Sequence, residues 1–309
     1  EEGLIKKVGS LKDMDEKAAN TVIDCAGTTV APGLFDSHVH PVLGDFTPRQ
    51  KQIDFFESEV HGGVTTSISA GEVHLPGRPK DPAGTKALAI LSAKSFAGFR
   101  PGGMKVLGGA LILEKGLVEK DFEECAREGV RVVGEIGLGS VKSPEDAAPM
   151  VKWAKKYGMV VMMHTGGTSI PGSTTVGLDQ VVKSDPDVVP HINGGPTACS
   201  IAEAENLITQ TSMAIEFVHC GNMKAAAEVG SLVAKHKAFH RVIIGNVPYL
   251  YPLPGTQVYE DARKNGMLQG DWTIDGPDPW VKLPWMMPDP PVMAELITGS
   301  EMTVLSSTM

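Results

Sequence analysis

Short β-branched and apolar runs alternate with amphipathic stretches along the first four fifths of the chain. Helical stretches are predicted at 83–99, 118–129, 143–158 and 223–239, and Ser143 followed by Pro144 is typical of a helix start. Eight apolar runs predict strands at 29–40, 63–71, 105–113, 131–139, 159–167, 187–195, 213–221 and 241–246. Strand and helix repeated eight times predict parallel pairing, and most simply a closed (β/α)8 barrel of the α/β class.

An open, doubly wound sheet is the alternative architecture for this pattern. Such a sheet is expected to carry a glycine-rich phosphate turn after its first strand, and the sequence has none there. The final fifth of the chain, from Val247 onward, differs from the rest. It contains six of the 14 methionines and three of the four tryptophans, and most of it shows neither helical nor strand periodicity. We therefore place it outside the barrel.

Composition narrows the class of partner. The net charge is −9 and no block of like charges occurs, which argues against nucleic acid or an anionic membrane as a partner. The sequence has no run of about 18 apolar residues, so it predicts no transmembrane helix. The four cysteines, at positions 25, 125, 199 and 220, show no paired spacing. They are typical of free thiols in a reducing compartment, so we expect a cytoplasmic protein.

Five polar residues fall near the ends of predicted strands. The stretch LFDSHVHP places His38 and His40 on one face of the first strand, Glu135 lies on the fourth, and His164 and His191 end the fifth and sixth. In a (β/α)8 barrel, functional groups gather at these strand ends. Imidazole nitrogen and carboxylate oxygen suit zinc and similar divalent ions, and a carboxylate between two histidine pairs can bridge two metals.

Each of these residues also has a structural interpretation when taken singly. An isolated His-x-His is a weak signal, Glu135 could be a salt-bridged core residue, and His164 and His191 could be structural histidines. All five at the same end of successive strands favour a metal site. His74, in the loop after the second strand, is expected to line the mouth of the pocket.

The stretch PGLFDSHVH, followed by a strand-4 carboxylate and by histidines that end strands 5 and 6, resembles the amidohydrolase superfamily. The stretches GGVTT, PGRPKD, AGTKALA, HTGGTSIPGS and HINGGPTA resemble its enamidase branch, over about residues 1 to 246. Dihydroorotase- and hydantoinase-like members often place a carboxylated lysine on strand 4, so Glu135 weighs against that branch.

The resemblance implies a binuclear centre with zinc, and with Fe²⁺ as the candidate second metal, in a homotetrameric cytoplasmic enzyme of nicotinate degradation. By position, His38 and His40 would hold one metal, Glu135 would bridge, and His164 and His191 would hold the other. A metal-bound hydroxide would attack the ring carbonyl of a cyclic enamide, 6-oxo-1,4,5,6-tetrahydronicotinate, and break its C–N bond. Because this substrate is a carboxylate, substrate contacts are expected from Arg78, Lys80, His74 and Asn193.

One position departs from the pattern of the superfamily. An aspartate is expected directly after Gly245-Asn246, as a metal ligand and general base, but this chain has Val247. Losing a general base typically costs about 10²–10⁴ in rate, so no catalytic residue is identified there and we expect impaired hydrolysis. There are two alternatives to an enamidase-like hydrolase. One is a hydrolase of another cyclic amide or imidazolone, and the other is a non-catalytic metal-binding barrel.

The resemblance also divides the chain into three parts. We expect 1–28 to be the remnant of a small β-sandwich domain, 29–246 to be the barrel, and 247–309 to be an atypical tail, either out-of-frame or disordered.

Overall fold

The computed structural model describes residues 5–14, 19–28, 30–41, 43, 52–75, 77–168, 173–194, 198–218, 222–245 and 303–305. The predictions for Val247 and for nearly all of the tail lie outside these residues.

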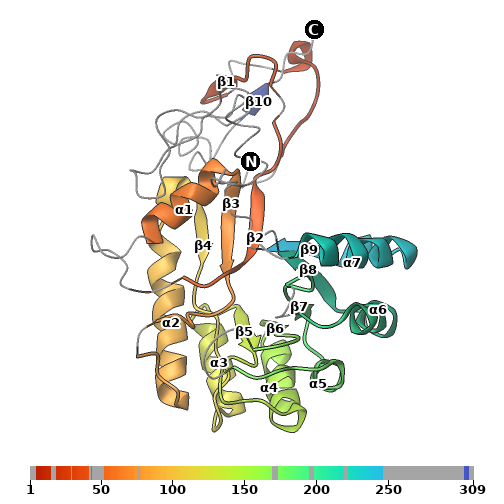
Figure 1. Cartoon of the computed structure of the whole chain (residues 1–309). Helices are drawn as coiled ribbons and strands as arrows, with labels where there is room; N and C mark the ends of the chain where they lie inside the picture. The colour runs from red at the N-terminus through yellow and green to blue at the C-terminus, as the bar shows by residue number, and fades with distance from the viewer. Residues whose placement is uncertain are drawn as a thin grey trace, which may run out of the picture.

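Parallel strands form the centre of the fold (Figure 1). The hydrogen-bonded orders are β2-β3-β4 and β5-β6-β7-β8-β9, and a parallel bridge between Leu111 and Val133 connects the two groups. On the other side, the Ser37 hydroxyl donates to the Ile244 carbonyl at 3.1 Å, which places β2 beside β9. Within the described residues the eight strands are β2 (Leu34–Val39), β3 (Val64–Ser69), β4 (Lys105–Leu107), β5 (Val132–Ile136), β6 (Val160–Met163), β7 (Val188–Val189), β8 (Ala214–Val218) and β9 (Val242–Gly245). The predicted (β/α)8 barrel is confirmed.

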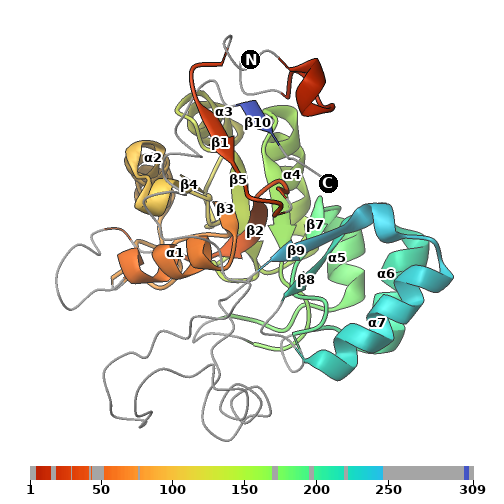
Figure 2. The ribbon, with the colours of Figure 1, turned by 90° about the horizontal axis from the view of Figure 1, so that it is seen from above.

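Helices follow the strands and lie outside them, as the view from above shows (Figure 2). The four helices predicted by range are all present, and the Ser143 hydroxyl accepts the Asp146 N–H at 3.2 Å at the start of one of them. No described helix is long and apolar enough to cross a membrane. The α-helices are α1 (Gln52–His61), α2 (Pro82–Gly98), α3 (Glu119–Arg127), α4 (Pro144–Lys156), α5 (Leu178–Ser184), α6 (Ile201–Gln210) and α7 (Met223–Lys235), with 3-10 turns at Leu11–Asp13, Pro101–Gly103 and Phe239–Arg241.

The main core fills the space between the helices and the strands. Phe122 of helix α3 is completely buried, and its ring centroid lies 5.8 Å from that of Trp153 in α4. The strands are shorter than the apolar runs that predicted them, and β4 shows why. Gly109 adopts a φ of +85°, and a Cβ there would lie 2.3 Å from the Ala89 carbonyl oxygen of α2. The backbone leaves the extended conformation at this point to pass close to the helix, which ends the strand early.

A second, two-stranded sheet pairs the two ends of the chain. Strand β1 (Val22–Asp24) runs parallel to β10 (Thr303–Leu305), with Ile23 opposite Val304. Figure 1 shows this pair away from the barrel strands. A β-sandwich remnant over 1–28 remains a prediction.

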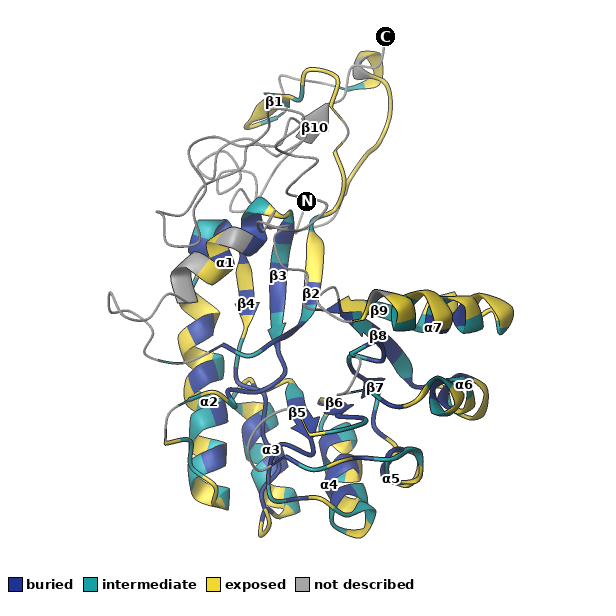
Figure 3. Ribbon diagram, in the orientation of Figure 1, coloured by how far each residue is buried: buried dark blue, intermediate teal, exposed yellow. Residues whose placement is uncertain are grey.

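One side of the barrel exposes apolar side chains. Phe35 of β2 is 59% exposed, and Ile244 of the neighbouring β9 is 56% exposed. Figure 3 shows the exposed part of β2 beside β9 and α7. In a (β/α)8 barrel the outer face of each strand is covered by a helix. Within the described residues no helix packs over this pair, so the face is an apolar patch open to solvent.

We expect the double substitution Phe35→Thr and Ile244→Thr to reduce binding of a hydrophobic dye and to slow aggregation. Threonine suits a strand, and both side chains are exposed, so the free energy of unfolding should change by less than about 0.5 kcal/mol per site. Dye fluorescence and urea titration measure the two effects. Val8→Thr, at an exposed position outside the helices and strands, is the control. Undiminished dye binding by the double variant would contradict the interpretation of this face.

Candidate metal centre

The barrel brings the five predicted residues together at one end of its strands. His38 lies in β2 and Glu135 in β5, while His40, His164 and His191 follow β2, β6 and β7 closely. His38, Glu135 and His164 are buried, and the other two are partly buried. Two groups of three could each hold a metal ion, with all ligand atoms of a group within 4.8 Å of one another: His38, His40 and Glu135, and Glu135, His164 and His191.

The two oxygens of Glu135 face different histidine pairs. Oε2 lies 3.5 Å from Nε2 of His38 and 3.5 Å from Nε2 of His40. Oε1 lies 2.7 Å from Nε2 of His191 and 3.9 Å from Nδ1 of His164. This is the geometry that a carboxylate bridging two metals requires, with one oxygen for each ion.

Within each pair, the ring nitrogens converge. Nε2 of His38 lies 3.2 Å from Nε2 of His40, and Nδ1 of His164 lies 3.1 Å from Nε2 of His191. Two imidazoles in such an arrangement can direct their lone pairs at one cation. The donor set therefore fits divalent ions that accept nitrogen and oxygen ligands.

The outer nitrogens of three histidines are fixed by acceptors. Nδ1 of His38 contacts the Glu216 carboxylate at 2.7 Å, and Nδ1 of His40 contacts the Gly71 carbonyl at 2.8 Å. Nε2 of His164 contacts the carbonyl of the residue three positions later, at 2.6 Å. An acceptor at the outer nitrogen places the proton there and leaves the inner nitrogen as a metal ligand.

His191 is held differently. Its φ of +40° lies in the left-handed region, which is unfavourable for a residue with a Cβ, and such strain is concentrated at functional sites. Its Nδ1 is buried and has no hydrogen-bond partner among the described residues. The backbone thus directs Nε2 of this residue toward Glu135 without an acceptor behind the ring.

Glu216 in β8 is a site residue that the sequence analysis missed. It is fully buried, accepts the Ser37 hydroxyl at 2.5 Å with Oε1, and contacts His38 with Oε2. A Cβ on Gly245 of β9 would lie 2.6 Å from Oε1 of Glu216 and 2.7 Å from the His38 Cβ, so glycine is required there. A glutamate within the apolar stretch MAIEFV was the available signal, because a buried carboxylate needs a partner.

Charged neighbours in the centre oppose the effect of burial on the pKa values of His38 and Glu135. Burial acts to lower the pKa of His38, but the Glu135 and Glu216 carboxylates outweigh it and raise that pKa well above its usual value. Burial acts to raise the pKa of Glu135, but His38 and His191 hold it well below its usual value. The pKa of His164 is lowered by burial and by His191, so its imidazole is neutral, as metal binding requires.

Behind His38 lies a pair of acidic side chains. The Asp36 carboxylate accepts the His38 backbone N–H at 2.9 Å and thereby fixes the start of the His-x-His segment. Glu59 of α1 is almost completely buried, and burial together with the Asp36 carboxylate raises the pKa of Glu59 to about 9. Glu59 is therefore protonated at neutral pH and accepts a hydrogen bond from Ser67.

The predicted substrate residues lie in different surroundings. His74 is exposed, and its ring centroid lies 5.4 Å from that of His40, at the edge of the centre. Asn193 is buried and bonds the backbone N–H and carbonyl of Val218 through its amide oxygen and nitrogen, at 2.8 and 2.9 Å. It connects the loop after β7 to β8. Arg78 and Lys80 line a cavity in the neighbouring loops.

A barrel with a histidine and carboxylate centre at its strand ends defines a class of protein. A solved structure of enamidase, described as a new member of the amidohydrolase superfamily, matches this chain with a TM-score of 0.74 and 58% sequence identity. It covers 80% of this chain, and this chain covers 64% of it. Over 80% of its length, this chain resembles that member of the amidohydrolase superfamily.

Sequence comparison gives the same assignment. Enamidase from Eubacterium barkeri is 58% identical over 246 residues, 80% of this chain and 64% of that protein. Dihydroorotase from Methanosarcina mazei is 24% identical over 237 residues, 74% of this chain and 48% of that protein. No protein-family model matches. The predicted resemblance to enamidase is confirmed, and the chain spans just under two thirds of the enamidase length.

We expect Glu216→Gln to lower the affinity of the centre for Zn²⁺ by about 10–100-fold, because the outer carboxylate orients His38 and raises its basicity. Competition with a chromogenic chelator on the metal-stripped protein measures this. Glu228→Gln, on the partly exposed surface of α7, is the control and should leave the affinity unchanged. An unchanged affinity in folded Glu216→Gln would show that Glu216 does not support the centre.

The raised pKa of Glu59 predicts a dependence of stability on pH. A carboxyl whose pKa rises from 4.5 to about 9 on folding binds its proton more tightly in the folded state. Its contribution is complete below the unfolded pKa and is lost as pH rises toward about 9. Glu59→Gln cannot ionise, so its free energy of unfolding relative to wild type should increase from about pH 5 to pH 9.

Urea unfolding at several pH values measures this relative stability. Glu57→Gln, at an exposed position of the same helix, is the control. Parallel pH profiles for wild type and Glu59→Gln would contradict the buried, protonated state of Glu59.

Proposed function

We propose that this protein is a metal-dependent hydrolase of cyclic amides, of the enamidase type, which breaks the C–N bond of a cyclic enamide or lactam. One observation carries the proposal: the two oxygens of Glu135 face two separate histidine pairs. The similarity to the Eubacterium barkeri enamidase supports it.

Under this proposal, His38, His40 and Glu135 hold one divalent ion, and Glu135, His164 and His191 hold the second. We propose zinc, with Fe²⁺ as the candidate for the second position, because these ions accept imidazole and carboxylate ligands. Such ions, when bound, lower the pKa of a water molecule and polarise a carbonyl group.

The protein's own residues prepare the centre for this chemistry. Glu216 and the Gly71 carbonyl hold the rings of His38 and His40 in one tautomer and orientation. Burial of Glu135 excludes bulk water and strengthens every charge interaction around it. We propose that His74, whose ring lies beside that of His40 at the exposed edge, contacts the substrate ring.

The finer assignment follows the resemblance. We propose a carboxylated cyclic enamide, 6-oxo-1,4,5,6-tetrahydronicotinate of nicotinate degradation, as the substrate, in a cytoplasmic homotetramer. Arg78 and Lys80 are the proposed carboxylate contacts. Asn193 is a weaker candidate, because both its amide oxygen and nitrogen already bond the backbone of β8.

Val247 favours a second candidate, a metal-binding barrel without hydrolytic activity. The superfamily aspartate that serves as ligand and base is expected at this position, which lies outside the described residues. We propose that this chain, with valine at position 247, binds metal through five ligands and hydrolyses its substrate poorly.

The test compares wild type, Val247→Asp and Glu135→Gln after loading with Zn²⁺, by the loss of substrate measured chromatographically for a panel of cyclic enamides, lactams and imidazolones with and without a carboxylate. Restoring the base should raise the rate by about 10²–10⁴. Glu135→Gln should lose both metal and activity. If fully loaded Val247→Asp hydrolyses none of the panel, the non-catalytic barrel is the better description. Turnover of imidazolones alone would assign a different substrate.

A further inference from the structure

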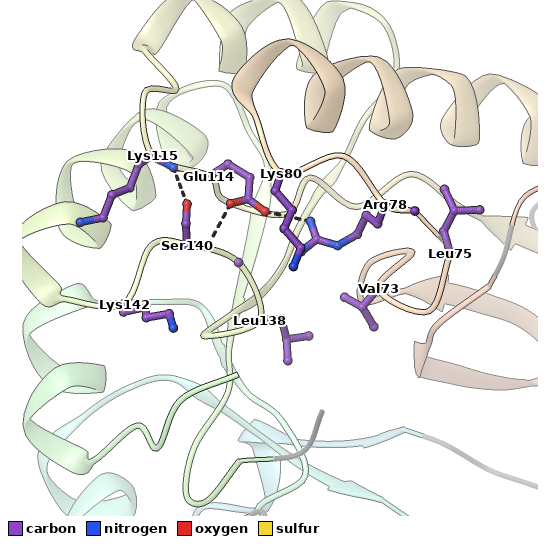
Figure 4. Close-up of a pocket in the computed structure, with 11 residues that line it drawn as sticks. Val73, Leu75, Arg78, Lys80, Glu114, Lys115, Leu138, Ser140 and Lys142 are labelled. Atoms are coloured by element: carbon purple, nitrogen blue, oxygen red, sulfur yellow. Dashed lines mark hydrogen bonds and ion pairs between the residues drawn. The ribbon is translucent and has the colours of Figure 1, made fainter. Parts of the chain in front are cut away.

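A cavity of about 640 Å³ lies between the loops that follow β3, β4 and β5 (Figure 4). The chain as a whole is acidic, with a net charge of −9, yet basic groups dominate this space. Four cationic side chains and one carboxylate line it: Arg78, Lys80, Lys115, Lys142 and Glu114. A concave site that is positively charged in an otherwise acidic protein favours an anionic ligand.

The most buried cation of the cavity is fixed by the carboxylate. Arg78 Nη1 bonds Glu114 Oε1 at 2.9 Å, and the two side chains are 9% and 1% exposed. Glu114 Oε2 accepts the backbone N–H of Ser140 at 3.0 Å, which ties the pair to the loop after β5. Removing two charges from water is costly, and this cost offsets much of the attraction between them. A contribution to stability alone therefore does not explain why the Arg78–Glu114 pair is buried.

The guanidinium retains donors for a ligand. Both hydrogen bonds of Arg78 to described residues, to Glu114 and to the Pro79 carbonyl, use the same nitrogen, Nη1. Nη2 and Nε have no acceptor within that part of the chain. In Figure 4 Arg78 and Lys80 extend into the space between the loops, whereas Lys115 points away, toward its ion pair with Asp146.

The cavity is lined by sequence neighbours of residues at the metal centre. Val73 and Leu75, which line it, flank His74, whose ring contacts that of His40. Leu138, which also lines the cavity, follows Glu135 by three residues, a span of at most about 11 Å. A small ring at the centre can therefore reach the cavity with a substituent.

We propose that this cavity is the carboxylate pocket of the active site, with Arg78 as the direct contact, Glu114 as the residue that positions it, and Lys80 and Lys142 at the rim. The assignment rests on the proposed function. It restricts the substrate to cyclic amides that carry an anionic group away from the bond that is broken.

Glu114 could position the Arg78 guanidinium, or it could simply reduce the positive charge of the cavity. These two roles predict opposite effects of Glu114→Gln on the affinity for an anion. Replacing the carboxylate by an amide makes the cavity more positive, so attraction alone would strengthen anion binding. If Glu114 instead holds the guanidinium with Nη2 toward the ligand, the same change weakens binding despite the added positive charge. Glu114→Gln therefore separates the two.

The experiment measures binding rather than turnover, so it does not depend on residue 247. Isothermal titration calorimetry on the full chain, with Zn²⁺ loaded and after stripping, compares 6-oxopiperidine-3-carboxylate with its neutral 3-carboxamide. These two lactams share one ring and differ in charge. We expect the loaded wild type to bind the carboxylate at least about tenfold more tightly than the amide, because a charge-assisted hydrogen bond is worth that factor or more.

Two variants of the pair and one control complete the test. Glu114→Gln should lose about tenfold in carboxylate affinity, with amide affinity unchanged. Arg78→Lys keeps the charge but has a single terminal nitrogen, which Glu114 occupies, and should lose a similar factor even if Glu114→Gln fails to fold. Lys152→Met, on the exposed surface of α4, should change neither affinity.

Equal binding of the two lactams by the loaded wild type would overturn the pocket while leaving the proposed function intact. Tighter carboxylate binding by Glu114→Gln would overturn the positioning role. If neither lactam binds the loaded wild type, the proposed function and this inference fail together. Charge selectivity that persists after metal stripping would support the pocket independently of the metals.

Discussion

The placement of one buried carboxylate, Glu135, between two pairs of histidines is the interaction on which the site depends. An ionised carboxylate with 4% exposure is costly unless opposing charges or hydrogen-bond donors surround it. Those groups come from β2 and from the segments after β6 and β7, so they meet only when the strands close into a ring. The ring in turn brings His38 beside Glu135, and each of them shifts the pKa of the other against the effect of burial.

Support for the centre extends outward in layers from this contact. Glu216 on β8 holds the outer nitrogen of His38, and Asp36 holds its backbone. Asp36 in turn lies beside Glu59, which remains protonated because a second negative charge at this depth is unfavourable. Each layer fixes the one inside it, so the histidine rings are held in position before any ion arrives.

The centre also lies beside the least covered part of the barrel. A Cβ on Gly245 of β9 would overlap both His38 and Glu216, and its neighbour Ile244 presents an exposed apolar side chain. The geometry of the first histidine pair thus depends on a strand whose outer face has no described helix over it. The opposite side, where Arg78 and Glu114 connect the loops, is packed and charged.

The sequence by itself determined the alternation of strands and helices and the residues at the strand ends, because both depend on local periodicity. His38, His40, Glu135, His164 and His191 could be identified from position alone. Only the tertiary structure revealed Glu216, which meets His38 across 178 residues, and the Arg78–Glu114 pair, which spans 36. These contacts depend on strand register and loop closure, which bring together side chains that no local pattern connects.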